Sequence, residues 1–205
     1  MDGSRESNAM AAFRRQAGIY ALEFALVFPV FFLLFYGLLS FGIVATVQQS
    51  LTMAAEEGAR ASLRYFLPAG AASASAQQQA LGRLAHGCDV ATYRAGWLGQ
   101  LGGAAAAPSC SAVLRGPCRQ ADGTIDASQT CTVTLGSGGG SAVACGYAQA
   151  EQCFAILTMS FAYGSNPLVP LLPGMGLLVP DVLRAGAQAA IDPATLRLAS
   201  TGGGA

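Results

Sequence analysis

Residues 24–47 have the sequence Phe24-Ala-Leu-Val-Phe-Pro-Val-Phe-Phe-Leu-Leu-Phe-Tyr-Gly-Leu-Leu-Ser-Phe-Gly-Ile-Val-Ala-Thr-Val47, and no charged side chain occurs between Glu23 and Glu56. As a helix rising about 1.5 Å per residue, this stretch would be roughly 36 Å long, enough to cross a hydrocarbon core of about 30 Å. It is too long for the apolar core of a cleaved signal peptide, which usually has about 7 to 15 residues. The stretch therefore predicts a retained transmembrane helix.

Composition limits the rest of the chain to one small domain. The chain has 205 residues, of which 53% are hydrophobic and 11% are charged. Its net charge is zero and its only basic cluster is Arg14-Arg15, which argues against nucleic-acid binding. These two arginines abut the amino end of the apolar stretch, whereas the next one, Arg60, lies well beyond its other end. This asymmetry predicts a cytoplasmic amino terminus and an exported remainder.

The order of residues in front of the apolar stretch is unusual for a plain anchor. Two arginines are followed by Gly18 and then, five residues later, by Glu23. A carboxylate costs about 2.5 to 3.5 kcal/mol at the centre of a bilayer and less near its interface. Glu23 could simply mark the interfacial edge of the span. Alternatively, a protease cuts after Gly18, and Glu23 serves the new α-amino group of Ile19.

These residues resemble a known processing site. Gly18-x-x-x-x-Glu23-Phe24 after a short basic leader is similar to the prepilin-peptidase site of type IV pilins, and Glu-Phe is typical of tight-adherence (Tad, or Flp) pseudopilins. The resemblance continues through Glu23-Phe-Ala-Leu-Val-Phe-Pro and Tyr36-Gly to Ala54-Ala-Glu-Glu-Gly-Ala-Arg-Ala61. It is a resemblance to the TadE-like family and covers about the first third of the chain. A looser similarity lies in Phe161-Ala-Tyr163 and in Leu183 to Ile191.

The resemblance implies a pseudopilin or minor pilin of a Tad/Flp-type IV pilus, without enzymatic activity or cofactor. A prepilin peptidase would cut between Gly18 and Ile19, and Glu23 with Phe24 would act in assembly. The implied partners are other pilin and pseudopilin subunits, the peptidase, the Tad inner-membrane assembly machinery and the lipid bilayer. The implied location is the inner membrane by a single pass, with a periplasmic carboxyl-terminal domain, or the pilus itself. Priming, tip and shaft roles remain open.

We expect a pilin-like α+β fold in three parts. These are a leader (1–18), a long helix (19–66) that contains the membrane span (24–47), and an exported disulfide-bonded domain with an antiparallel sheet (67–205). The helix would be roughly 70 Å long and would end before Pro68 and Gly70. Its small residues could pack against other subunits in a filament, but packing on the chain's own sheet is the favoured interpretation: Ala54, Ala55, Gly58, Ala59 and Ser62.

Weaker patterns predict the elements of the domain. Ser73 could cap a helix that Gly87 ends. Alternating apolar residues predict a strand from Cys153 to Tyr163. Two further segments, 131–135 and 142–145, would form a hairpin around the glycine-rich stretch 136–141.

All six cysteines follow the apolar stretch, which predicts disulfides in an oxidising compartment: Cys88, Cys110, Cys118, Cys131, Cys145 and Cys153. The expected hairpin would place Cys131 opposite Cys145. We therefore expect Cys131 to pair with Cys145, Cys110 with Cys118, and Cys88 with Cys153. Zinc is disfavoured because the chain has no Cys-x-x-Cys motif and a single histidine, His86.

Two rival functions remain open. One is an exported binding, adhesin or enzymatic domain on an ordinary signal anchor, not processed as a pilin, in which Glu23 is incidental. The other is an anchored component of the secretion channel or a filament-tip adhesin, for which the apolar segment 167–180 would be the contact surface. His86 and Cys88 could suggest a thiol and its base, but a surface histidine near a helix end is the favoured interpretation.

Overall fold

The computed structural model describes residues 3–64, 76–102, 107–136, 143–170 and 179–193, and within the first helix it describes side chains from Tyr20 onward. The fold is α+β, as predicted: a long apolar helix is followed by a four-stranded antiparallel sheet with three disulfides. The chain forms two compact units, Met1–Val44 and Ala45–Ala205. Each unit is described separately below.

Helix α1 extends from Gly3 to Leu63 with Pro29 in its interior. The prediction placed its start at Ile19, whereas the helix begins 16 residues earlier. Strong helix formers explain the earlier start, because segment 5–15 contains arginine, glutamate, methionine and alanine and no glycine or proline. The predicted end, Phe66, lies outside the described residues.

The carboxyl-terminal part of α1 is a core helix of the second unit. Val47, Leu51 and Ala55 are almost completely buried there. The stripe of small residues is also buried, and a Cβ atom added at Gly58 would lie 3.0 Å from Cδ2 of Leu157 in the sheet. The favoured interpretation of this stripe as an internal packing surface is therefore confirmed.

Helix α2 covers Ala76–Ala95, and α3 covers Trp97–Gly102. The prediction that Gly87 ends the second helix is wrong, because α2 continues for eight residues beyond it. Gly87 lies at a close approach between α1 and α2. A Cβ atom there would be 2.7 Å from the carbonyl oxygen of Gly58, and a Cβ atom at Gly58 would be 2.6 Å from the carbonyl oxygen of Gly87. The glycine serves helix packing rather than helix termination.

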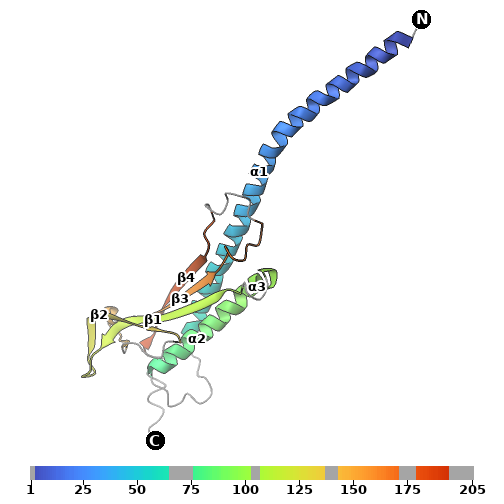
Figure 1. Ribbon diagram of the computed structural model, residues 1–205. Helices are drawn as coiled ribbons and strands as arrows, with labels where there is room; N and C mark the ends of the chain where they lie inside the picture. Colours follow the sequence, from blue (N-terminus) through green and yellow to red (C-terminus); the bar gives the residue numbers. More distant parts are fainter. Residues whose placement is uncertain (1–2, 65–75, 103–106, 137–142, 171–178, 194–205) are drawn as a thin grey trace. The chain divides into compact units, whose positions relative to one another are not determined.

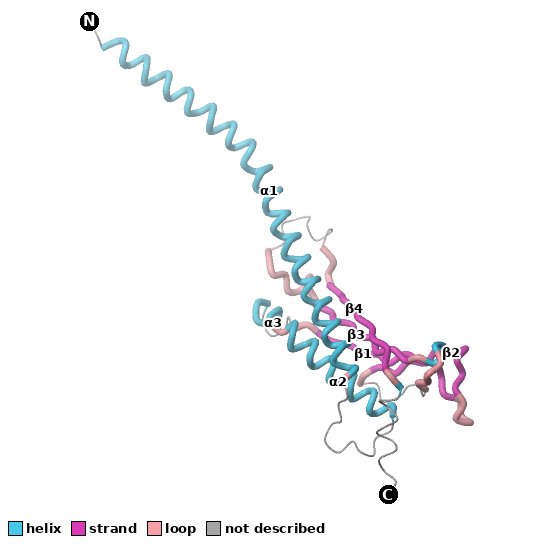
Figure 2. Tube along the Cα trace, turned by 180° about the vertical axis from the view of Figure 1, so that it is seen from behind, coloured by secondary structure: helices cyan, strands magenta, loops and turns pink. Residues whose placement is uncertain are grey.

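The sheet contains β1 (Ser109–Arg119), β2 (Ile125–Thr134), β3 (Cys153–Phe161) and β4 (Leu183–Ile191), in the order β2-β1-β3-β4 (Figures 1 and 2). A short 3₁₀ helix, η3 (Gln149–Glu151), precedes β3. The strand predicted over Cys153–Tyr163 is confirmed to within two residues. Its residues alternate strictly, so Leu157 and Met159 are fully buried whereas Ile156 and Thr158 are partly exposed.

The predicted hairpin of segments 131–135 and 142–145 is wrong. Strand β2 pairs with β1, and Val143 forms only an isolated bridge with Cys118. The prediction failed because β1 was not recognised. Gly116 and Pro117 suggest a turn, yet both lie within the strand, where a Cβ at position 116 would lie 2.5 Å from Sγ of Cys153. Pro117 is next to a break in the register, a place where a strand tolerates proline.

The six cysteines form disulfides, as predicted, but the predicted pairing is wrong. The bonds join Cys88 to Cys110, Cys118 to Cys131, and Cys145 to Cys153. The β1–β2 pairing places Cys131 opposite Gly116, so that its Cα lies 5.0 Å from that of Cys118. The Cys88–Cys110 bond joins α2 to β1, and the Cys145–Cys153 bond joins the start of β3 to the segment before it.

Removing the Cys88–Cys110 bond should destabilise the domain more than removing the Cys145–Cys153 bond. The two bonds close segments with sequence separations of 22 and 8 residues. Loop-closure entropy then predicts a cost of roughly 3 kcal/mol for the longer loop and about 1 kcal/mol less for the shorter one. Urea unfolding of the paired Cys→Ala variants measures this difference. Peptide mapping of the non-reduced protein checks the pairing, and a peptide joining Cys131 to Cys145 would contradict it.

Candidate functional site

The first unit exposes an almost continuous apolar surface. Phe24 is 65% exposed and Phe41 is 73% exposed. Similar exposure holds for the other large apolar side chains of this part of α1: Tyr20, Leu22, Leu26, Val27, Phe28, Val30, Phe31, Phe32, Leu33, Leu34, Phe35, Leu38 and Leu39. A surface of this kind is not stable in water and must be covered by lipid or by other apolar surfaces. Among the described residues, one helical stretch, Tyr20–Leu63, is long and apolar enough to cross a membrane.

Aromatic rings form a ladder along this helix. Phe24 stacks on Phe28 with ring centroids 5.1 Å apart, and the contacts continue from Phe28 to Phe32 and from Phe32 to Tyr36, each at 6.0 Å. Residues four apart lie on the same face of a helix, so these rings form one stripe. The stripe is a continuous aromatic surface that begins next to Glu23.

Glu23 is an exposed carboxylate between two exposed apolar side chains, Leu22 and Phe24. It forms no ion pair with the part of the chain that the structure describes. Gly18 and Ile19 lie in the helical backbone just before it. Because Ile19 is four residues before Glu23, the two positions lie on the same face, one turn apart.

Polar contacts join α1 to α2 and α3 within the second unit. Arg94 of α2 lies 2.6 Å from the carboxylate of Glu57 in α1, at a partly exposed position. The indole nitrogen of Trp97 donates a hydrogen bond of 3.0 Å to the hydroxyl of Ser50. Together with the Gly58–Gly87 approach, these contacts hold residues 45–63 of α1 against the rest of the unit.

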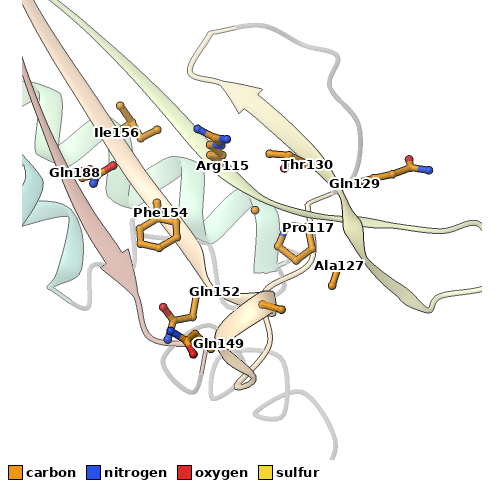
Figure 3. A pocket seen from close by; sticks show the side chains of 12 residues that line it. Arg115, Pro117, Ala127, Gln129, Thr130, Gln149, Gln152, Phe154, Ile156 and Gln188 are labelled. Carbon is orange, nitrogen blue, oxygen red and sulfur yellow. The ribbon is translucent and has the colours of Figure 1, made fainter.

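The face of the sheet opposite the helices contains a shallow groove of about 360 Å³ (Figure 3). Its apolar part is formed by Phe154, Ile156 and Pro117. Exposed Arg115 supplies a cation that forms no ion pair with the described residues. Polar side chains complete the lining: Gln129, Thr130, Gln149, Gln152 and Gln188. A cation among amide groups and an aromatic ring can bind polar or carboxylate-bearing ligands.

The remaining candidates do not form a reactive site. Cys88 is bonded to Cys110, so it offers no thiol for His86 to activate.

Two exposed carboxylates hold the β1–β2 hairpin: Asp122 accepts hydrogen bonds from the hydroxyl and backbone nitrogen of Thr124, and Asp126 accepts them from Ser128. The pKa of both carboxyls is lowered, mainly by the hydrogen bonds that the hydroxyl groups of Thr124 and Ser128 donate. These hydrogen bonds stabilise the hairpin fully at pH values above the ordinary carboxyl pKa. The stabilisation is lost as the pH falls through the lowered pKa values of the two carboxyls.

Sequence reasoning missed the groove and the helix approach. The outer residues of β1 and β3 alternate with core residues, so Arg115, Phe154 and Ile156 share one face. This signal was present in Ser109–Arg115, where Cys110, Ala112 and Leu114 alternate with other residues. No sequence signal connected Gly58 with Gly87, because the need for glycine at both positions arises only from the close approach of the two helices in space.

Comparison with known proteins gives one family match. The model of the family described as TadE-like protein matches residues 18–60. The matched segment begins at Gly18, includes Glu23 and Phe24, and covers about a fifth of the chain. The predicted resemblance is thereby confirmed over this segment. No curated protein and no solved structure matches the chain.

Proposed function

We propose, on the premise that residues 18–60 form the helix of a TadE-like protein, that this chain is a pseudopilin or minor pilin of a Tad-type pilus. Its role is structural rather than enzymatic. The observation that carries this proposal is Glu23, a single carboxylate at the start of an exposed apolar helix, five residues after Gly18. On a plain membrane anchor this carboxylate would only mark the interfacial edge of the span, whereas the pilin proposal gives it a partner.

The proposed maturation begins with insertion. Arg14 and Arg15 hold the leader in the cytoplasm, and the apolar part of α1 spans the inner membrane. A prepilin peptidase then hydrolyses the peptide bond between Gly18 and Ile19, which leaves a free α-amino group at Ile19. The carboxyl-terminal domain lies in the periplasm, an oxidising compartment in which its three disulfides can form.

The proposed assembly step pairs opposite charges in an apolar environment. The amino group at Ile19 of one subunit pairs with Glu23 of its neighbour. The pairing offsets the cost of holding a carboxylate near hydrocarbon, because each charge then has a partner. The aromatic stripe and the other exposed apolar side chains of α1 supply the lateral packing between helices.

The mature protein should begin at Ile19 in a host that contains a prepilin peptidase. Intact mass and amino-terminal sequencing of the membrane-bound protein measure this directly. In a peptidase-deficient host the same gene should give the unprocessed chain, which serves as the control. Recovery of the full leader from the peptidase-positive host would contradict the proposal.

A second candidate function is an anchored binding or adhesin domain, and the groove around Arg115 favours it. The groove combines a cation, several amide groups and an aromatic ring on a face that the helices leave uncovered. Under this alternative, Arg115→Ala abolishes function while Glu23→Gln leaves it unchanged. Under the pilin proposal, Glu23→Gln abolishes pilus assembly whatever the groove binds.

A further inference from the structure

The groove on the uncovered face of the sheet contains a cation without a counter-ion. Arg115 is exposed and forms no ion pair with the described residues. In the part of the chain that the structure describes, no carboxylate lines the groove. Glu151, which lies between two lining glutamines in the sequence, packs against Gly146 instead. A ligand in this groove therefore meets a net positive charge, which favours an anion.

An aromatic ring lies directly beside this cation. The strand register places Phe154 of β3 opposite Arg115 of β1, a position at which two Cβ atoms are about 5 Å apart. On its other side Phe154 is opposite Ala190 of β4, whose methyl group is too small to cover the ring. Phe154 is only partly buried, and Figure 3 shows its ring among the side chains that line the groove. The ring therefore offers an apolar face next to the guanidinium group.

Neutral groups that both donate and accept hydrogen bonds form the rest of the polar lining. They are four amides and one hydroxyl: Gln129, Gln149, Gln152, Gln188 and Thr130. The backbone of Arg115 and Phe154 is used within the sheet, because β1 and β3 each pair with a strand on both sides. Recognition must therefore come from side chains. Amides suit a ligand with several hydroxyl groups better than an extended peptide, which needs free backbone partners.

We propose that the groove binds an acidic sugar, a pyranose ring with a carboxylate, such as a uronate residue of a polysaccharide. Its carboxylate accepts charge-assisted hydrogen bonds from Arg115, the C–H face of its ring packs on Phe154, and its hydroxyls exchange hydrogen bonds with the glutamine amides. The volume of about 360 Å³ is within the usual range of small-ligand sites. The proposal identifies a ligand for the groove that the second candidate function uses, and it does not depend on processing as a pilin.

The ligand class can be tested by isothermal titration calorimetry on the purified full-length protein in detergent, where neither peptidase processing nor pilus assembly affects the result. The probes are trisaccharides of galacturonate, glucuronate and mannuronate, and their methyl esters. At least one acid should bind. Its ester, which keeps the ring and the hydroxyls but lacks the charge, should bind about tenfold more weakly. Failure of all three acids to bind at millimolar concentration, or equal binding of acid and ester, would overturn the proposal.

A peptide probe tests the competing ligand class. Trialanine has a free terminal carboxylate but no sugar ring and no hydroxyl groups, so it should bind at least tenfold more weakly than the acid sugar. Trialanine binding as tightly as the best trisaccharide would show that the groove recognises a carboxylate alone, and would overturn the proposal.

Substitutions test which side chains hold the sugar. Arg115→Gln keeps a hydrogen-bonding side chain but removes the cation, and it should lower the affinity for the acid to that for the ester. Phe154→Leu keeps an apolar side chain but removes the ring, and it should weaken binding of the acid about fivefold. The fluorescence of Trp97 during urea unfolding checks that both variants fold like the wild type.

Arg184→Gln is the matched control. Arg184 is exposed and shares the outer face of β4 with Gln188, because residues separated by an even number lie on one face of a strand, but it does not line the groove. Its replacement should leave the affinity unchanged. An equal loss of affinity in Arg184→Gln and Arg115→Gln would indicate diffuse attraction to surface charge and would overturn the proposal.

Discussion

Cells in which Glu23→Gln replaces the wild-type chain are expected to lack Tad pili, although the protein still inserts into the membrane. Glutamine has nearly the shape of glutamate but cannot neutralise the amino group at Ile19 of a neighbouring subunit. Each subunit would then add an unpaired cation to an apolar environment, at a cost of several kcal/mol. Because every copy of this chain that joins the pilus would carry this cost, we expect assembly to fail. Electron microscopy counts the pili, and immunoblots of membrane fractions confirm insertion.

Glu56→Gln is the matched control for this experiment. It makes the same chemical change in the same helix, but Glu56 lies outside the apolar stretch, in an exposed pair with Arg60 at 3.9 Å. Such a pair contributes about 1 kcal/mol or less, so piliation should be unchanged. Normal pili on Glu23→Gln cells would exclude the proposed assembly step and favour the anchored binding domain.

Gly58→Val should prevent stable folding of the second unit. Its Cβ atom would lie 2.6 Å from the carbonyl oxygen of Gly87 and 2.9 Å from Cβ of Ala91, so α1 and α2 would have to separate. Replacing glycine in a helix gains about 1 kcal/mol of propensity at most, whereas overpacking against a backbone costs about 1 to 3 kcal/mol or more. Separation would also break the contacts between α1 and the sheet, so the loss should exceed the gain by a wide margin.

Trp97 reports this change directly. It is the chain's single tryptophan, and it is hydrogen-bonded to Ser50 of α1. Its fluorescence during urea unfolding in detergent should show a much lower midpoint for Gly58→Val than for the wild type. Gly42→Val is the control, because a Cβ atom at Gly42 meets nothing within 4 Å. Equal midpoints for all three proteins would contradict the close packing of α1 on α2.

Local sequence patterns predicted those helices and strands that are determined by residues within a single segment. The apolar stretch indicated the long helix, and strict alternation indicated the strand that begins at Cys153. Prediction failed where the type of a residue is explained by its contact with a distant segment of the chain. Gly87 resembles a helix end, yet its partner is Gly58, and Pro117 resembles a turn, yet it lies at a bulge in a strand.

The sequence by itself determined that this chain has an apolar helix with one carboxylate at its start, and that its cysteines form disulfides. Both follow from residue type and order, because apolar length and charge position act within one segment. Only the tertiary structure decided which cysteines pair and how the strands are ordered. These depend on the register between β1 and β2 and on the approach of two helices, and contacts between distant segments are set by packing of the whole unit rather than by any local pattern.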